Sequence, residues 1–405
     1  MASSNSAGPV SLGFDLSDSV RKPGRGESRQ TPSRPTPSQL PAIDPLLQIA
    51  KPKPARASFT FKLRPRDIKT HLDRFVIRQD DAKKALSVAL CDHFQHVRMT
   101  REGDPAPHYT KQNLLILGPT GVGKTHLIRS AAELIGVPFV KADATKFSET
   151  GYVGGDVEEL IRDLIRRAGG DLERASQGII YLDEIDKIAG RESGTRDVSG
   201  RGVQTNLLKL MEDADVPVLS PGEAPPPGTP RPREQTINTR HILFIASGAF
   251  AGLDAIVRDR LGPDAGMDHS QLIDAATTRD FIAFGFEPEF IGRLPVRVAC
   301  RALDADDLFH VMRDSESSML RQYERAFRAY GIRVKFRADG LRRIAALAAA
   351  EKTGARGLMT VAERILREFK FELPSSRVRE LVVDRNLVDS PREVLHRLLR
   401  RRHTR

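Results

Sequence analysis

Short apolar runs separated by amphipathic segments define the central part of the chain. Runs at 114–117, 179–182 and 241–247 have the length and composition of buried strands. Residues 156–166 place apolar side chains at i, i+3 and i+4, which is typical of a helix with one face against a core. This pattern predicts an α/β fold, with a parallel sheet flanked by helices.

The pattern changes toward both ends of the chain. A helical segment is predicted from Ile68 to His93, and helices dominate from Ala302 onward, with a strand pair at 332–336 and 380–383. Residues 216–236 are crowded with proline and glycine and are predicted to form a surface loop. We therefore divide the chain into a disordered basic tail rich in Ser, Pro and Arg (1–57), an α/β domain (58–300), a smaller, mainly helical domain (301–390) and a basic C-terminal tail (391–405).

Composition narrows the classes of protein. The 405 residues carry a net charge of +11 and two distant cysteines, so neither a disulfide framework nor a cysteine-based zinc site is expected. The sequence has no membrane-spanning run and no secretory signal, which favours the cytoplasm and excludes a membrane partner. The basic charge favours nucleic acid as a partner, but no zinc finger or aromatic-interleaved basic platform accompanies it, so such a partner is not expected.

A phosphate-binding loop follows the first apolar run. It reads Gly118, Pro119, Thr120, Gly121, Val122, Gly123, Lys124 and Thr125, a complete G-x-x-x-x-G-K-T pattern. Its backbone N–H groups can surround the phosphates of a nucleotide, and the helix that begins near Lys124 adds its positive end. The pattern predicts ATP as ligand, with Lys124 on the β- and γ-phosphates and the Thr125 hydroxyl on Mg²⁺.

Two carboxylates follow the second apolar run. Asp183 and Glu184 come at the carboxyl end of a predicted parallel strand, where α/β proteins place their ligands. Asp183 is the candidate for the Mg²⁺ shell, and Glu184 can orient and polarise the attacking water. Together with the phosphate loop, the pair predicts an ATPase.

Several motifs carry a resemblance to a known family. They include 118–125, Gly151-Tyr152-Val153-Gly154, Asp183-Glu184-Ile185-Asp186-Lys187, Thr195-Arg196-Asp197-Val198-Ser199-Gly200, Pro288-Glu289-Phe290-Ile291-Gly292-Arg293 and Gly354-Ala355-Arg356-Gly357. From about Ile68 to Val388 the chain resembles the ClpX family of AAA+ protein unfoldases. The resemblance implies an AAA+ P-loop ATPase domain followed by a helical lid domain. It also implies a homo-hexameric, chaperone-type ring that acts on unfolded or tagged proteins.

The resemblance also assigns residues. Arg293 matches the arginine finger that reaches the ATP of the next subunit, and Arg356 matches the sensor-2 arginine of the lid. Val76 and Ile77 match the apolar pair that packs on adenine, although a plain core role is an alternative. Ser247 lies where a polar sensor-1 group contacts the attacking water.

Two loops match those that line the axial channel of the family's rings. In the first, Tyr152 and Val153 stand between glycines, and an exposed aromatic side chain there can grip a threaded polypeptide. The alternative is an ordinary turn with the tyrosine packed beneath it. The second loop is 195–200, and Arg201 follows it where the family usually has an acidic residue, which predicts a more basic channel.

Three departures from the family limit what the resemblance implies. The family's N-terminal zinc-binding domain is replaced by the basic tail, and the basic loop at the channel entrance by a proline-rich one with Arg231 and Arg233. No I-G-F-type tripeptide that would dock the ClpP protease is found, because 282–286 aligns elsewhere. A ClpP-type partner remains possible, but we favour a stand-alone remodeller. Two alternatives stay open, namely an AAA+ ATPase acting on nucleic acid or nucleoprotein complexes and a non-hydrolysing scaffold.

Overall fold

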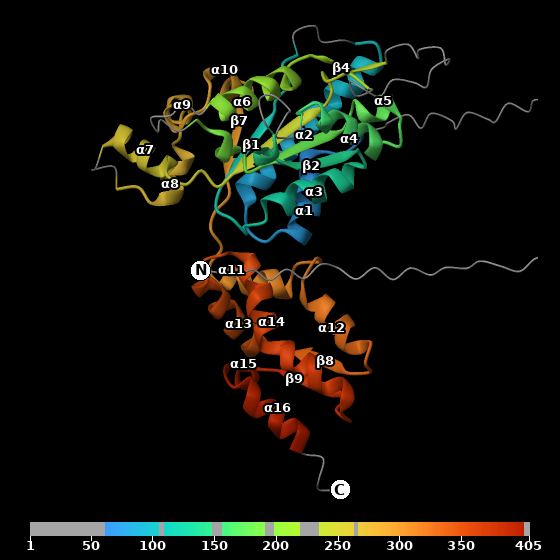
Figure 1. Ribbon diagram of the computed structural model, residues 1–405, viewed down its shortest axis with the longest axis vertical. Coiled ribbons are helices and arrows are strands. Elements are labelled where there is room, and N and C mark those ends of the chain that lie inside the picture. Colours follow the sequence, from blue (N-terminus) through green and yellow to red (C-terminus); the bar gives the residue numbers. More distant parts are fainter. Residues whose placement is uncertain are drawn as a thin grey trace, which may run out of the picture. The chain divides into compact units, whose positions relative to one another are not determined.

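The computed structural model describes residues 61–104, 109–147, 156–190, 198–218, 235–262 and 266–400. A parallel sheet of five strands in the order β2-β3-β6-β1-β7 forms the centre of the first domain (Figure 1). Its strands are β1 (Leu114–Leu117), β2 (Phe139–Asp143), β3 (Ile179–Asp183), β6 (Leu243–Gly248) and β7 (Val296–Ala299). The predicted parallel sheet flanked by helices is therefore confirmed.

Both faces of the three central strands, β3, β6 and β1, are buried, which explains why these strands are almost wholly apolar. Successive side chains of a strand point to opposite faces. Ile179 and Tyr181 of β3 lie in the core beneath α1 (Pro65–Phe75), α2 (Asp80–Arg101) and α3 (Lys124–Ile135). Ile180 and Leu182 lie in the opposite core, with α4 (Glu159–Arg167), α6 (Val198–Met211) and α7 (Leu253–Leu261).

Shorter elements complete this domain. They are the 3₁₀ turns η2 (Ala144–Lys146) and η3 (Ile185–Ile188) and the helices α5 (Leu172–Ala175), α8 (His269–Asp274), α9 (Thr278–Phe284) and α10 (Pro288–Gly292). β4 (Asp215–Pro217) and β5 (Thr236–Asn238) pair in antiparallel fashion and hold the two ends of the proline-rich segment together.

The C-terminal segment has its own hydrophobic core (orange to red in Figure 1). It contains α11 (Ala305–Arg313), α12 (Leu320–Arg328), α13 (Ala338–Ala350), α14 (Ala355–Glu372), η5 (Leu373–Ser375), α15 (Arg385–Asp389) and α16 (Pro391–Arg400). The predicted strand pair is present as β8 (Arg333–Phe336) and β9 (Glu380–Val383), which are parallel. Because parallel strands need a long crossover, α13 and α14 fit between them in the sequence.

The expected tail at 391–405 is wrong for its first ten residues. Pro391–Arg400 form α16, which buries Leu395 and packs Val394, Leu398 and Leu399 against the core of the C-terminal domain. These apolar residues lie at helical spacing within a basic sequence, so their pattern outweighs the charge of the arginines between them.

The helix expected from Ile68 to His93 is also interrupted. α1 ends at Phe75 and α2 begins at Asp80, and the residues between them are not helical. Arg78 and Gln79 adopt left-handed backbone angles, with φ of 59° and 61°. Gln79 is held there by its side-chain amide, which donates to the Arg301 carbonyl and accepts from the Arg301 N–H, both at 2.8 Å. This tertiary contact overrides the helical pattern.

Several predictions lie outside the described residues, among them the tail 1–57 and the loop that carries Tyr152 and Val153. None of the helices described is both long and apolar enough to span a bilayer.

Buried histidines beneath the sheet make stability depend on pH. His93 is fully buried, and its ring Nε2 donates to the His241 carbonyl at 3.0 Å. Burial lowers the pKa of His93 to about 3 and that of His241 to about 4. In the unfolded chain both histidines bind a proton near pH 6.5. Protons therefore favour unfolding from roughly pH 6.5 down to about pH 4 for His241 and about pH 3 for His93.

We therefore expect the free energy of unfolding, measured by urea denaturation, to decrease as the pH is lowered through this window. His93→Gln keeps a donor for the carbonyl but cannot titrate, and it should flatten the dependence whatever its effect on stability at neutral pH. An unchanged pH slope in this variant would contradict the assignment.

Candidate active site

The phosphate loop joins the end of β1 to the start of α3. Gly118, Gly121 and Gly123 adopt positive φ angles of 138°, 81° and 98°. Only glycine takes such angles at little cost, and these angles turn the backbone toward the helix N-terminus. Both glycines of the pattern, Gly118 and Gly123, therefore have a conformational reason, and so does the additional Gly121.

Two other segments close on this loop from outside. A Cβ at Gly118 would collide with the carbonyl of Cys300, and one at Gly121 would collide with the carbonyl of Thr353. The Ala355 N–H donates to the Gly121 carbonyl at 2.9 Å. The loop is thus packed between the end of β7 and the turn that opens α14 of the C-terminal domain.

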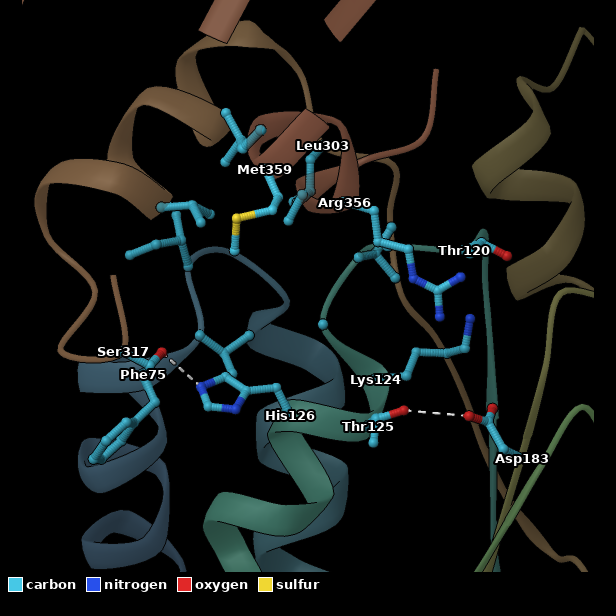
Figure 2. A pocket seen from close by; sticks show the side chains of 18 of the residues that line it. Phe75, Thr120, Lys124, Thr125, His126, Asp183, Leu303, Ser317, Arg356 and Met359 are labelled. Carbon is cyan, nitrogen blue, oxygen red and sulfur yellow. Dashed lines mark hydrogen bonds between the residues drawn. The ribbon is translucent and has the colours of Figure 1, made fainter. Parts of the chain in front are cut away.

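Two cations face the cavity beside this loop. Lys124 Nζ donates to the carbonyls of Gly118 and Pro119 at 2.5 and 2.9 Å, and burial lowers the pKa of Lys124. Arg356, at the start of α14, lines the same cavity, and Figure 2 shows its guanidinium directed toward Lys124. The structure brings these two predicted residues together from different domains.

Asp183 lies at the centre of a hydrogen-bond network. Its Oδ1 accepts from the Ser247 hydroxyl at 2.9 Å, and its Oδ2 accepts from the Thr125 hydroxyl at 3.3 Å (Figure 2) and from Lys141 Nζ at 2.7 Å. The Tyr181 hydroxyl joins Ser247 at 2.6 Å and Thr125 at 3.2 Å. Burial acts to raise the pKa of Asp183, but hydrogen bonds from Lys141 and Ser247 outweigh it and hold the pKa below its usual value.

Glu184 has an unusual backbone for its residue type. Its φ is 58°, where non-glycine residues are uncommon, and its exposed side chain lines the cavity next to Asp183. The following turn is held by buried Asp186, which accepts from the N–H groups of Ala249 and Phe250 at 3.2 and 3.3 Å. Strain of this kind is typical of residues placed for function.

The cavity has a volume of about 720 Å³ and an apolar end away from these charges. Val76 and Ile77 line it from the break between α1 and α2, and Leu358 and Met359 line it from α14. Val76 is only 4% exposed and belongs to the hydrophobic core. This residue therefore has both the core role given as the alternative and a place in the cavity wall.

Polar contacts between the two domains border the apolar end. His126 of α3 and Ser317 are 2.8 Å apart at their Nε2 and Oγ atoms (Figure 2). Arg74 of α1 donates to both carboxylate oxygens of Glu316 at 2.7 and 3.0 Å. Sequence reasoning missed these residues, because only the fold brings 74, 126 and 315–317 to one edge.

Arg293 does not line this cavity. It follows α10, and its Nη2 lies 2.6 Å from Glu212 Oε1 at the end of α6. The Arg293 carbonyl accepts from buried Asn113 at 3.0 Å, which fixes the backbone beside β1. Within one chain, therefore, the predicted arginine finger is separated from the other predicted catalytic residues.

Arg201, an exposed residue, forms an ion pair with Glu287 within the chain. The expectation of a more basic channel stays a prediction.

Comparisons with known proteins agree with this geometry. Residues 110–297 match the family model described as an AAA domain of the Cdc48 subfamily. The ATP-dependent Clp protease ATP-binding subunit ClpX 3 of Methylococcus capsulatus is 42% identical over 350 residues, which cover 80% of each chain. The ClpX subunit of Borrelia duttonii is 41% identical over 343 residues, covering 80% of this chain and 78% of that protein. The ClpX subunit of Porphyromonas gingivalis is 40% identical over 338 residues, with 80% of each chain covered. The chain belongs to the ClpX family.

Membership of the ClpX family confirms the predicted AAA+ ATPase and the binding of a nucleotide. Among the cavities lined by the described residues, this one joins the phosphate loop, two carboxylates and a cation of the lid, which are the features expected of a nucleotide site.

Two residues that approach the carboxylates were not found from the sequence. Lys141 and Tyr181 belong to no recognised motif, but the register of β2 and β3 indicates that they lie near Asp183. Asp143 of β2 pairs with Asp183 of β3, so Lys141 pairs with Tyr181, and alternate residues share one face of the sheet. In this chain the register places Lys141 opposite Tyr181, two residues before Asp183.

The tight packing around Gly121 gives a testable prediction with a matched control. Gly121 and Gly136 have nearly the same φ, 81° and 78°, but a Cβ at Gly136 meets nothing within 4 Å. Gly136→Ala should cost only the left-handed conformation, about 1 kcal/mol. Gly121→Ala must in addition displace the Thr353 carbonyl, at about 1–3 kcal/mol.

We expect calorimetric titration to give a nucleotide affinity at least about tenfold weaker for Gly121→Ala than for Gly136→Ala. Equal affinities in the two variants would show that the loop and the lid do not depend on this contact.

Proposed function

We propose that this ClpX-family chain hydrolyses ATP in a homo-hexameric ring and uses the energy to unfold and thread protein substrates. The observation that carries the proposal is the division of the site. The phosphate loop, Asp183, Glu184 and Arg356 line one cavity, while Arg293 lies outside it against Glu212. Such a site is complete only when a neighbouring subunit supplies its arginine.

Nucleotide binding follows from the residues around the cavity. The N–H groups of 118–125 and the N-terminus of α3 would hold the phosphates, and Lys124 would exchange its carbonyl partners for the β- and γ-phosphates. Val76 and Ile77 would pack on the adenine. Arg356 would connect the phosphates to α14, so that the nucleotide state sets the position of the lid.

The oxygen ligands present fit Mg²⁺. The Thr125 hydroxyl and Asp183 Oδ2 are 3.3 Å apart, close to the spacing of about 3 Å expected for adjacent ligands in a magnesium shell. No cluster of His, Cys, Asp and Glu in the described ranges could hold a metal by itself, which suits an ion that arrives with the nucleotide. When bound, Mg²⁺ neutralises charge on the phosphates.

Separate side chains of the protein then carry out the separate steps of ATP hydrolysis. Glu184, held at the end of β3 by its backbone conformation, orients the attacking water and polarises it. Ser247 keeps Asp183 in place, which supports a structural part for this residue beside the sensor-1 role suggested by the family. Arg293 of the preceding subunit would stabilise the charge of the transition state, for which its planar fork is suited.

Mechanical work would come from loops in the ring's channel. Tyr152 and Val153 would grip the polypeptide, and 195–200, which run into the first turn of α6, would form a second contact. The curated relatives are named as subunits of a Clp protease, so we infer that a ClpP-type partner is possible for a ring in the cytoplasm. A stand-alone remodeller remains our preferred form.

The proposal is tested by ATP-dependent loss of fluorescence from a stably folded reporter that carries one of several C-terminal tails. The active protein should unfold at least one reporter, whereas Glu184→Gln should bind ATP and leave the reporter folded. Tyr152→Ala should retain ATP hydrolysis but lose unfolding. If peptides of the reporter are released when ClpP is added, the protein is a protease subunit. Robust hydrolysis without unfolding of any reporter would contradict the unfoldase assignment.

Mixed rings test the position of Arg293. Arg293→Ala alone should assemble and hydrolyse about 10³-fold more slowly, the effect of an arginine finger in related systems. Mixing it with Glu184→Gln should restore part of the activity, because some interfaces then combine an intact Glu184 with a neighbour's Arg293. The double variant, mixed with Glu184→Gln, is the control and should stay inactive. If mixing restores nothing, Arg293 does not act across the interface.

A further inference from the structure

Lys141 occupies a position beside the predicted metal ligands that no motif explains. Its Nζ lies 2.7 Å from Asp183 Oδ2 and 3.4 Å from the Thr125 hydroxyl oxygen. These are the two groups whose oxygens fit Mg²⁺. The ammonium therefore neutralises the carboxylate at the point where a divalent cation would approach it.

The backbone explains how the lysine reaches this point. Lys141 pairs with Tyr181 in the parallel register of β2 and β3, and Asp183 is two residues further along β3 on the same face. The Lys141 ammonium lies 5.7 Å from the centre of the Tyr181 ring, so the side chain extends along the strand toward Asp183. Because β2 is the edge strand of the sheet, the side chain, about one-third exposed, also has room to move away.

The two oxygens of Asp183 have separate partners. Oδ1 accepts from Ser247, which the Tyr181 hydroxyl fixes in turn, so this side of the carboxylate is held by buried groups. Oδ2 is shared by Lys141 and Thr125. Loss of the lysine would thus leave the orientation of Asp183 intact while removing the positive charge from Oδ2.

We propose that Lys141 is a built-in cation that competes with Mg²⁺ for Oδ2 of Asp183 and so weakens the dependence of nucleotide binding on the metal. The proposal rests on the proposed function, since it takes Thr125 and Asp183 as the metal ligands. Without Mg²⁺, Lys141 screens Asp183 from the phosphates. With Mg²⁺, the ammonium must leave Oδ2, because two cations cannot share this oxygen without repulsion.

The measured quantity is the ratio of two nucleotide dissociation constants, one in EDTA and one in Mg²⁺, obtained with fluorescent ADP on the full-length protein. Lys141→Met keeps the apolar stem and removes the charge. Metal-free binding should weaken and metal-bound binding should tighten, so the ratio should rise about tenfold, within the usual range of coupling between two ligands.

Matched variants separate a local effect from a general change of charge. Lys141→Arg keeps a cation and should leave the ratio near that of the unmodified protein. Lys84→Met removes the same charge from an exposed lysine of α2, whose nearest acidic atom, on Asp81, is 3.9 Å away, and should not alter the ratio. A ratio in Lys141→Met equal to that of the unmodified protein would overturn the proposal.

Two further outcomes distinguish this proposal from the proposed function. If Lys141→Met lowers turnover at saturating Mg²⁺ while the ratio stays unchanged, Lys141 acts on the phosphates instead of Asp183, and the competition is refuted although the ATPase stands. The proposed site itself is wrong if the unmodified protein binds no nucleotide in either condition. It is also wrong if the Lys124→Ala variant binds nucleotide as tightly as the unmodified protein.

Discussion

The phosphate loop has no space for a side chain at the two points where other segments touch it, and the arrangement of the domains depends on this contact. At Gly118 the carbonyl of Cys300 fills the space, and at Gly121 the carbonyl of Thr353 fills it. Cys300 ends the α/β domain, and Thr353 precedes α14 of the lid. A displacement of the loop would therefore reach both segments by backbone contact, since tightly packed interiors have few ways to absorb a displacement.

Three of the protein's cations, two beside the cavity and Arg293 outside it, each have a partner within the chain. Lys124 donates to loop carbonyls, Lys141 pairs with Asp183, and Arg293 pairs with Glu212. Buried or half-buried charges need such partners, because an unpaired charge away from water is costly. Under the proposed function, nucleotide, metal and neighbouring subunit would replace these partners, so each binding event would exchange one electrostatic contact for another.

How much the sequence alone could predict depended on how local each feature is. The strand, glycine turn and helix around 118–125 are set by neighbouring residues, and both the position of the loop and its glycines could be predicted. The break at Arg78 and Gln79 could not, because it is held by Arg301, which is distant in sequence. Lys141 was missed for the same reason, since its role depends on the register of two strands. α16 could have been found from its apolar spacing, but its arginines suggested a tail.

Helix α6 offers a route from the substrate channel to the chemistry. It begins at Val198, within the predicted second channel loop (195–200). Gln204 in its middle donates to the Ile188 carbonyl at 2.9 Å and accepts from the Glu287 N–H at 2.8 Å. Ile188 belongs to the turn after Glu184, and Glu287 opens the helix that leads to Arg293. The residue directly after α6 is Glu212, the partner of Arg293. Under the proposed function, a displacement of α6 by a gripped polypeptide would reach both Glu184, the proposed water-activating carboxylate, and Arg293, the proposed arginine finger. Both halves of the divided site would respond together, because one rigid helix contacts them both.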